Sequence, residues 1–92
     1  MLNPLYFRHI DGGLYRFIYH ARDADTAGPV VVYEHLWPFE AGIWVRRADE
    51  FFARFSPVSP EFVEQALAGD REQAQQAVSS AKALRRAERD RQ

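Results

Sequence analysis

The strongest constraint on this chain is a β-branched run, Val30-Val31-Val32, which continues as Tyr33-Glu34-His35-Leu36. Valine and tyrosine favour strands, and three consecutive valines indicate a strand that is covered on both faces at that end. The segment Ile43 to Arg46 follows after a short loop, so the two segments predict a central hairpin. We therefore expect the centre of the fold to consist of Val30, Val31, Val32 and Val45.

The two halves of the chain differ in composition. Residues 1–56 hold twelve of the thirteen aromatic residues, whereas residues 57–92 are rich in Ala, Gln, Glu and Arg. Strand formers thus dominate the first half and helix formers the second, and Pro57 and Pro60 interrupt regular structure between them. We predict a small β-domain over residues 1–58 and a helical extension over residues 59–92 that is not an independent domain.

Further short strands are expected on both sides of the central hairpin. Residues 5–10 and 14–21 flank Asp11-Gly12-Gly13, which is a strong hairpin turn signal. A helical turn over residues 47–52 and a short strand at 54–56 complete four or five antiparallel strands. This pattern predicts a mainly β fold, a small SH3-like barrel followed by two C-terminal helices. An open four-stranded sheet is the alternative.

The segment 14–21 alternates in the manner of a half-buried strand. Tyr15 and Phe17 share one parity, and Arg16 and His20 share the other. Because successive side chains of a strand point to opposite faces, we expect Tyr15 and Phe17 to face the core and His20 to face away from it.

The second half contains two helix signals. Ser59 with Pro60 is a favourable start, and an apolar stripe follows at helical spacing. Asp70 is a second N-cap, for a helix that runs to about Arg89 with a thin apolar face. That helix can dock on the β-domain, pair with a second copy or fray. The stripe of the first helix comprises Phe62, Val63, Ala66 and Leu67.

A longer pattern joins the segments of the first half. It consists of Phe7-Arg8-His9, Gly12, Leu14-Tyr15, Ala21, Val31-Val32-Tyr33, Leu36 and Trp44-Val45-Arg46 with Phe51. The pattern resembles the bacterial family catalogued as domain of unknown function 1653, over about residues 5–56. The family's Trp-Val-Arg-Pro run followed by Met-Phe differs here at Arg47 and Glu50. The resemblance implies a small bacterial β-domain and carries over no activity and no catalytic residue.

Composition excludes several function classes. The 92 residues carry a net charge of −1 and no cysteine. Disulfides, thiolate nucleophiles and cysteine zinc sites are therefore excluded, and we expect a cytoplasmic protein. The first residues lack the pattern of a signal peptide, and no apolar run is long enough to span a membrane, so no membrane partner is expected.

The candidate ligand-binding residues are Arg8, Tyr33, Trp44 and Arg46. Trp44 and Arg46 are two positions apart on a predicted strand, so their side chains share a face. A guanidinium beside an aromatic wall suits a carboxylate, a phosphate or a stacked base. The competing structural interpretation is that Trp44 covers one end of the barrel while Arg46 pairs with a carboxylate such as Glu34.

The sequence offers little sign of catalysis or of a metal. His9, His20 and His35 lack the short spacing of a preformed zinc site, and no known catalytic motif is present. We expect no catalytic residue, no metal and no cofactor, and we interpret His9 as a hydrogen-bonded structural residue.

The leading functional hypothesis is a non-catalytic binding module for a small anionic ligand, a nucleotide or a peptide. The alternative is a structural protein that forms homo-oligomers through residues 59–92. Binding of nucleic acid by the basic run 82–91 is a third idea, but interleaved Glu88 and Asp90 favour a solvated helix there. A small enzyme is the remaining hypothesis.

Overall fold

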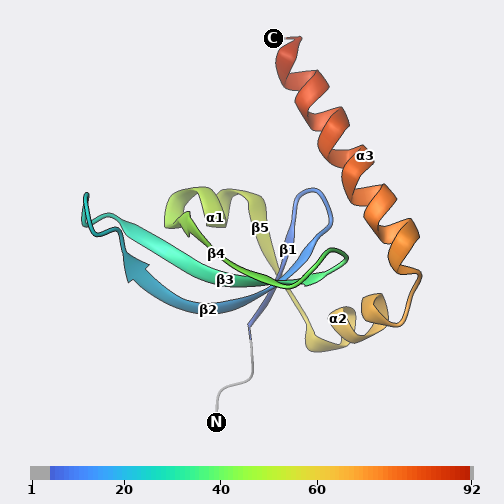
Figure 1. Ribbon diagram of the computed structural model, residues 1–92, viewed down its shortest axis with the longest axis horizontal. Helices are drawn as coiled ribbons and strands as arrows, with labels where there is room; N and C mark the ends of the chain where they lie inside the picture. The colour runs from blue at the N-terminus through green and yellow to red at the C-terminus, as the bar shows by residue number, and fades with distance from the viewer. Residues whose placement is uncertain (1–4, 92) are drawn as a thin grey trace.

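The protein is described by a computed structural model that places residues 5–91 (Figure 1). The ends of the two predicted domains, residues 1–4 and 92, lie outside the described part. The strands are β1 (Tyr6–His9), β2 (Leu14–Arg22), β3 (Pro29–Trp37), β4 (Gly42–Arg47) and β5 (Phe55–Val58). The helices are α1 (Ala48–Arg54), α2 (Pro60–Leu67) and α3 (Arg71–Asp90).

All five strands form one antiparallel sheet in the order β4-β3-β2-β1-β5. The sheet is open, with β4 and β5 as its edges, and it is followed by helices. The predicted mainly β fold with C-terminal helices is confirmed, with five strands. The sheet is curved, because Arg46 of one edge strand lies 5.8 Å from the ring of Phe55 on the other edge. The face inside this curve is called the concave face below.

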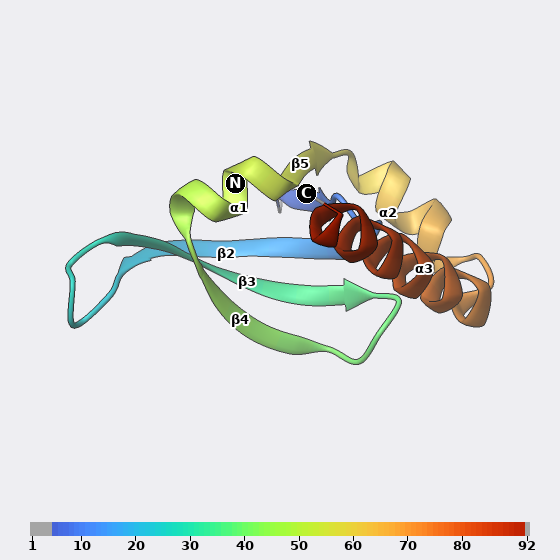
Figure 2. The ribbon, with the colours of Figure 1, turned by 90° about the horizontal axis from the view of Figure 1, so that it is seen from above.

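Helix α1 crosses from β4 to β5 and closes one end of the concave face (Figure 2). Its Phe51 is fully buried and stacks on Phe55 at 4.2 Å between ring centres. The ring of Phe51 also contacts Phe7, edge-on at 5.1 Å between ring centres, and Tyr33, tilted at 5.2 Å. The core of this small domain is therefore a cluster of aromatic rings around one residue of α1, which fits the need of short chains for large apolar side chains.

A β-bulge in β2 changes which residues face the core. The register against β3 shifts between Phe17 and Tyr19, so the alternation of side chains restarts. His20 consequently pairs with buried Val31 and lies on the concave side of the sheet, with its ring 5.0 Å from Phe17, although His20 and Tyr19 are both exposed. His20 therefore lies on the same side as Phe17, against the predicted alternation, because a period-two pattern does not reveal a bulge, but it stays outside the core.

The valine-rich strand is central as predicted, with one exception. Val30 and Val31 are buried and Val32 is half-buried. Val45 is 62% exposed, so its assignment to the centre of the fold was wrong. Its strand, β4, is an edge, and Val45 lies on the face opposite to the concave one, where neither α1 nor α3 packs.

The caps of both C-terminal helices are confirmed. The Ser59 hydroxyl accepts from the backbone N–H of Phe62 at 3.1 Å, and the Asp70 carboxylate accepts from that of Gln73 at 3.0 Å. Of the predicted apolar stripe of α2, Val63 is buried, whereas Phe62 and Leu67 are each 45% exposed. No helix in residues 5–91 is both long enough and apolar enough to cross a membrane.

Substitution of Phe51 tests the position of the core. We expect Phe51→Ala to lower the free energy of unfolding by about 3–5 kcal/mol, because a fully buried ring leaves a cavity. The neighbouring Phe52 is 51% exposed and provides a matched control. Phe52→Ala should cost about 1 kcal/mol. Urea unfolding followed by circular dichroism measures both values, and equal losses would contradict the assignment.

Candidate functional site

The part of the concave face that α1 leaves uncovered opens into a groove of about 500 Å³. Helix α3 forms its opposite wall, beside the β1–β2 and β3–β4 turns (Figures 1 and 2). The sheet side of the groove is lined by His9, Tyr15, His35, Trp44 and Arg46. The helix side is lined by Val78, Ser79, Lys82, Arg85, Arg86 and Arg89.

Polar contacts attach α3 to the sheet at two places. The Arg85 guanidinium donates two hydrogen bonds to the carboxylate of Asp11, at 3.0 and 2.9 Å. Near the start of the helix, Arg71 and Gln75 both donate to the carbonyl oxygen of Pro38, at 2.8 and 2.9 Å. No residue of α3 is buried, so these contacts, rather than an apolar interface, position the helix.

The β1–β2 turn, which lies against α3, needs a glycine for its own conformation. Gly12 has φ +107°, a conformation that other residues rarely adopt. A Cβ at this position would lie 3.5 Å from Val78 of α3. Glycine is therefore needed for the conformation of the turn, whereas the added Cβ would make only an ordinary van der Waals contact with the helix.

The Asp11–Arg85 pair is well shielded. The Asp11 side chain is 7% exposed and that of Arg85 is 31% exposed. Hydrogen bonding to Arg85 holds the pKa of Asp11 below its ordinary value and raises the pKa of Arg85. The two groups are therefore ionised together, and the pair is an electrostatic connection between residues 74 positions apart.

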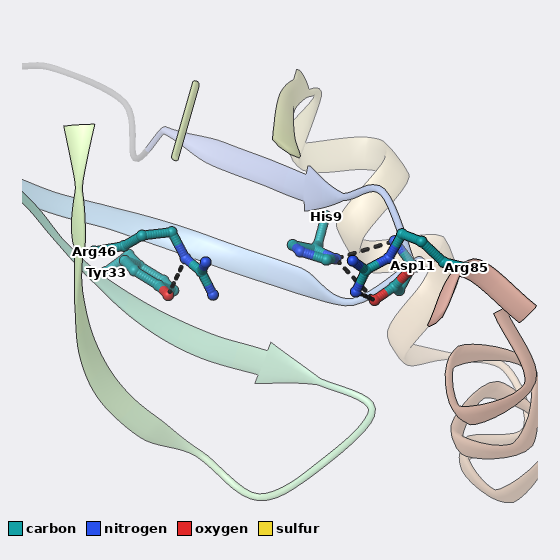
Figure 3. Close-up of polar contacts among 5 residues, drawn as sticks. All are labelled: His9, Asp11, Tyr33, Arg46 and Arg85. Carbon is teal, nitrogen blue, oxygen red and sulfur yellow. Dashed lines mark hydrogen bonds and ion pairs between the residues drawn. The ribbon is translucent and has the colours of Figure 1, made fainter. Parts of the chain in front are cut away.

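Arg46 extends from β4 across the concave face (Figure 3). Its Nε–H donates to the hydroxyl of buried Tyr33 at 3.2 Å, and its charge lies over the ring of Phe55 at 5.8 Å. The contact with Glu50 is longer, 3.8 Å, and Glu50 is half-exposed. The guanidinium is therefore oriented by the core but only weakly neutralised.

His9 is neutral at physiological pH. Its Nδ1 accepts a hydrogen bond from the backbone N–H of Asp11 at 3.0 Å. Burial lowers its pKa to about 4, with smaller opposing and reinforcing effects from Asp11 and three arginines. Because Nδ1 is the acceptor, the single proton of the neutral ring is on Nε2. His9 thus offers the groove a neutral donor.

Two further groups beneath the groove keep their protons or remain uncharged. Burial raises the pKa of Tyr15 to about 12, so its hydroxyl stays protonated. Burial lowers the pKa of His35, whose Nε2 accepts from the backbone N–H of Phe39 at 3.0 Å. His9, Tyr15 and His35 on the sheet side of the groove are therefore all uncharged at neutral pH.

The charge balance of the groove is positive. Among its lining residues, two are acidic, Asp11 and Glu40, and Asp11 is already paired. Six are Lys or Arg: Arg46, Arg54, Lys82, Arg85, Arg86 and Arg89. A cleft lined mainly by one sign of charge attracts ions of the opposite sign. The arrangement is thus suited to bind an anion.

The structure unites three of the four predicted ligand-binding residues. Trp44 and Arg46 line the groove, and Tyr33 supports Arg46 from beneath. Arg8 does not line it, because Arg8 is exposed on the opposite parity of β1 from buried His9. Glu34 lies with Arg16 on the other face of the sheet, at 3.0 Å, so the carboxylate near Arg46 is Glu50, at 3.8 Å, and not Glu34.

Several groove residues were not predicted from the sequence. The helix contributes Lys82, Arg85, Arg86 and Arg89, which recur at the spacing of one helical face, so a signal was present in the basic run. For Asp11 no sequence signal existed, since its partner is 74 positions away. Within residues 5–91, no group of three or more His, Asp or Glu side chains is placed to hold a metal ion.

Comparison with known proteins identifies the family. The sequence model of the family DUF1653, described as a protein of unknown function, matches residues 5–58, which is more than half of the chain. The chain therefore belongs to the DUF1653 family, and the resemblance seen in the sequence is confirmed. No curated protein and no solved structure matched the chain.

Removal of the Asp11 charge should weaken the attachment of α3. We expect Asp11→Asn to lower the free energy of unfolding by about 1.5–3 kcal/mol at pH 7, the usual value for hydrogen bonds to charged groups. Since the pKa of Asp11 is lowered on folding, this stabilisation is present above the ordinary value of 3.8 and is lost as pH falls below it. The difference between the two proteins should therefore shrink in acid.

Urea unfolding at several pH values measures this difference. Asp25, which is exposed in the β2–β3 loop, provides the control substitution Asp25→Asn. An Asp11→Asn protein as stable as the wild type at pH 7 would contradict a structural role for the ion pair.

Burial of neutral His9 should make stability depend on pH in a separate window. In the unfolded chain His9 has its ordinary pKa of 6.5, whereas in the folded chain its pKa is about 4. The free energy of unfolding therefore decreases as pH falls between these two values. The loss should reach about 2–3 kcal/mol at pH 4. His9→Asn should remove this part of the pH dependence, and His20→Asn, the control, should keep it. If the free energy of unfolding of His9→Asn falls with pH as steeply as that of the wild type, the prediction is wrong.

Proposed function

We propose that this protein is a non-catalytic binding module that holds an anionic ligand in the groove between the concave face and α3. The observation that carries the proposal is the charge of that groove, where six Lys or Arg residues meet two carboxylates. The groove volume of about 500 Å³ is within the range of small-molecule sites.

Arg46 is the central residue of this proposal. It extends over the groove from a rigid strand, and its orientation is set by Tyr33 and Phe55. A guanidinium held in this way loses little conformational freedom when it binds a carboxylate or phosphate. Trp44 provides the aromatic wall beside it, and Tyr33 acts as a positioning residue. Arg8, on the other face, is not part of the proposed site.

The state of His9 favours binding over catalysis. A general base works best when its pKa is near the working pH, whereas that of His9 is lowered to about 4. Its Nδ1 is occupied by the backbone N–H of Asp11. The group therefore supports the proposal as a hydrogen-bond donor to an anion through Nε2–H.

A finer fold assignment belongs with this proposal. The strand order β4-β3-β2-β1-β5, with a helical connection before the last strand, supports a partly open SH3-like barrel. Barrels of this kind hold many functions, so the assignment does not itself argue for a ligand. We also propose a bacterial origin and a cytoplasmic location.

Self-association through residues 59–92 is the second candidate. It is supported by Leu84 and Leu67, which are 62% and 45% exposed on α3 and α2. Two separated leucines are weaker support than a charged groove, because scattered exposed apolar residues are normal. Anion binding is therefore the function that the geometry favours.

Neutralising Arg46 tests the proposed site. We expect Arg46→Gln to weaken the binding of pyrophosphate at least about tenfold, the effect of losing one charge-assisted contact. The neighbouring Arg47 points the other way and pairs with Asp49 at 3.1 Å, with a side chain that is 70% exposed. Arg47→Gln removes the same charge outside the groove and should bind almost as wild type.

Isothermal titration calorimetry at low ionic strength measures these affinities, and circular dichroism confirms that both variants are folded. Equal weakening by Arg46→Gln and Arg47→Gln would show that only net charge matters. That result, or a wild-type protein that binds no anion, would reject the proposed site.

A further inference from the structure

The helix wall of the groove carries a row of positive charges rather than a single one. Lys82, Arg85, Arg86 and Arg89 occupy positions i, i+3, i+4 and i+7, which share one side of a helix and extend for about 10 Å. Arg85 is bound to Asp11. Within residues 5–91 no ion pair involves Lys82, Arg86 or Arg89. Three cations without an ion pair therefore follow one another along the wall, and Lys82 is near enough to Asp11 to help lower the pKa of that carboxyl.

The sheet wall carries an exposed aromatic side chain. Trp44 is 58% exposed, although a domain of this size needs its large rings for burial. Its indole lies against Gly42, where a Cβ would be only 3.1 Å from the indole Nε1. The ring is thus placed against the backbone of a strand, at the groove, and without an extensive burial role. Phe39, 39% exposed, also lines the groove.

The row of cations and the exposed aromatic ring lie on opposite walls, and each binds a different chemical group of a ligand. The cations along α3 match an anion with several charges in sequence, which a single phosphate does not offer. The indole of Trp44 matches a planar ring. An acidic peptide would satisfy the cations but has no base to stack. Duplex nucleic acid would satisfy them too, but its bases are already stacked on one another and are not free to stack on Trp44.

Resting on the proposed anion-binding function, we propose that the groove takes a short segment of single-stranded nucleic acid. Consecutive phosphates bind Lys82, Arg86 and Arg89, and one base stacks on Trp44. Arg46 and the neutral donor of His9 lie on the sheet side of the groove, where sugar, phosphate or base edges can accept their hydrogen bonds. Combining a cationic track with aromatic stacking is a general mode of single-strand recognition.

The salt dependence of binding measures the phosphate contacts. We use fluorescein-labelled hexathymidylate with the full chain and follow fluorescence anisotropy over a series of salt concentrations. For three neutralised phosphates, log K against log salt should have a slope of about −2. The double variant Arg86→Ala, Arg89→Ala should reduce the slope to about −0.7. Arg22→Ala, an exposed charge removed at the end of β2, should leave the slope unchanged.

Substitution of Trp44 measures the stacking separately. Trp44→Ala should weaken hexathymidylate binding about tenfold or more while the salt slope stays the same. Trp44→Phe should restore most of the affinity, because phenylalanine also offers a ring for stacking. Circular dichroism confirms that each variant is folded, as expected for substitutions of exposed residues.

A hexaglutamate peptide and pyrophosphate separate this inference from the proposed function. If hexaglutamate binds as tightly as hexathymidylate, or if Trp44→Ala has no effect, the nucleic-acid assignment is overturned while anion binding in the groove stands. If neither polymer nor pyrophosphate binds the wild-type chain, both are overturned. Tighter binding of hexathymidylate together with the Trp44 effect supports both.

Discussion

The groove depends on one interaction, the ion pair between Asp11 and Arg85. The carboxylate of Asp11 is almost fully shielded from water. Because burying an unpaired charge is costly, Asp11 keeps its contact with Arg85 unless the whole of α3 moves away. The helix has no buried residue of its own that would hold it elsewhere. The bonds from Arg71 and Gln75 to Pro38 fix the start of the helix, and the ion pair fixes its direction. The cationic wall faces the sheet for this reason.

The concave face has two parts with different physical tasks. Around α1 it is filled by Phe51 and neighbouring rings, and these supply the core that a short chain without disulfides needs. Towards α3 it is lined by groups that carry positive charge or are neutral, apart from Asp11 and Glu40. Arg46 lies where the two parts meet and contacts both, through Tyr33 and Phe55 on one side and the groove on the other. The stability of the core therefore helps to orient the proposed binding residue.

The local features of this fold were accessible from the sequence, and the long-range ones were not. Alternation and valine content predicted the central strands, and Ser59 and Asp70 predicted two helix starts, because these signals act within a few residues. The bulge that places exposed His20 on the concave side leaves no mark in the alternation, and the exposure of Val45 depends on its strand being an edge. The parity of β4 placed Trp44 and Arg46 on one face. That α3 would face them required the contact of Asp11 with Arg85, which only the assembled fold reveals.

The separation of these partners has a consequence for the order in which the molecule assembles. All five strands lie within residues 6–58, whereas Arg85 is 74 positions beyond Asp11. A ribosome delivers the sheet first, and its strands can pair before α3 has left the ribosome. Until α3 docks, the carboxylate of Asp11 lacks its Arg85 partner and the groove lacks its cationic wall. The last step of folding is then electrostatic, because α3 binds the completed sheet through the contact of Arg85 with the carboxylate of Asp11.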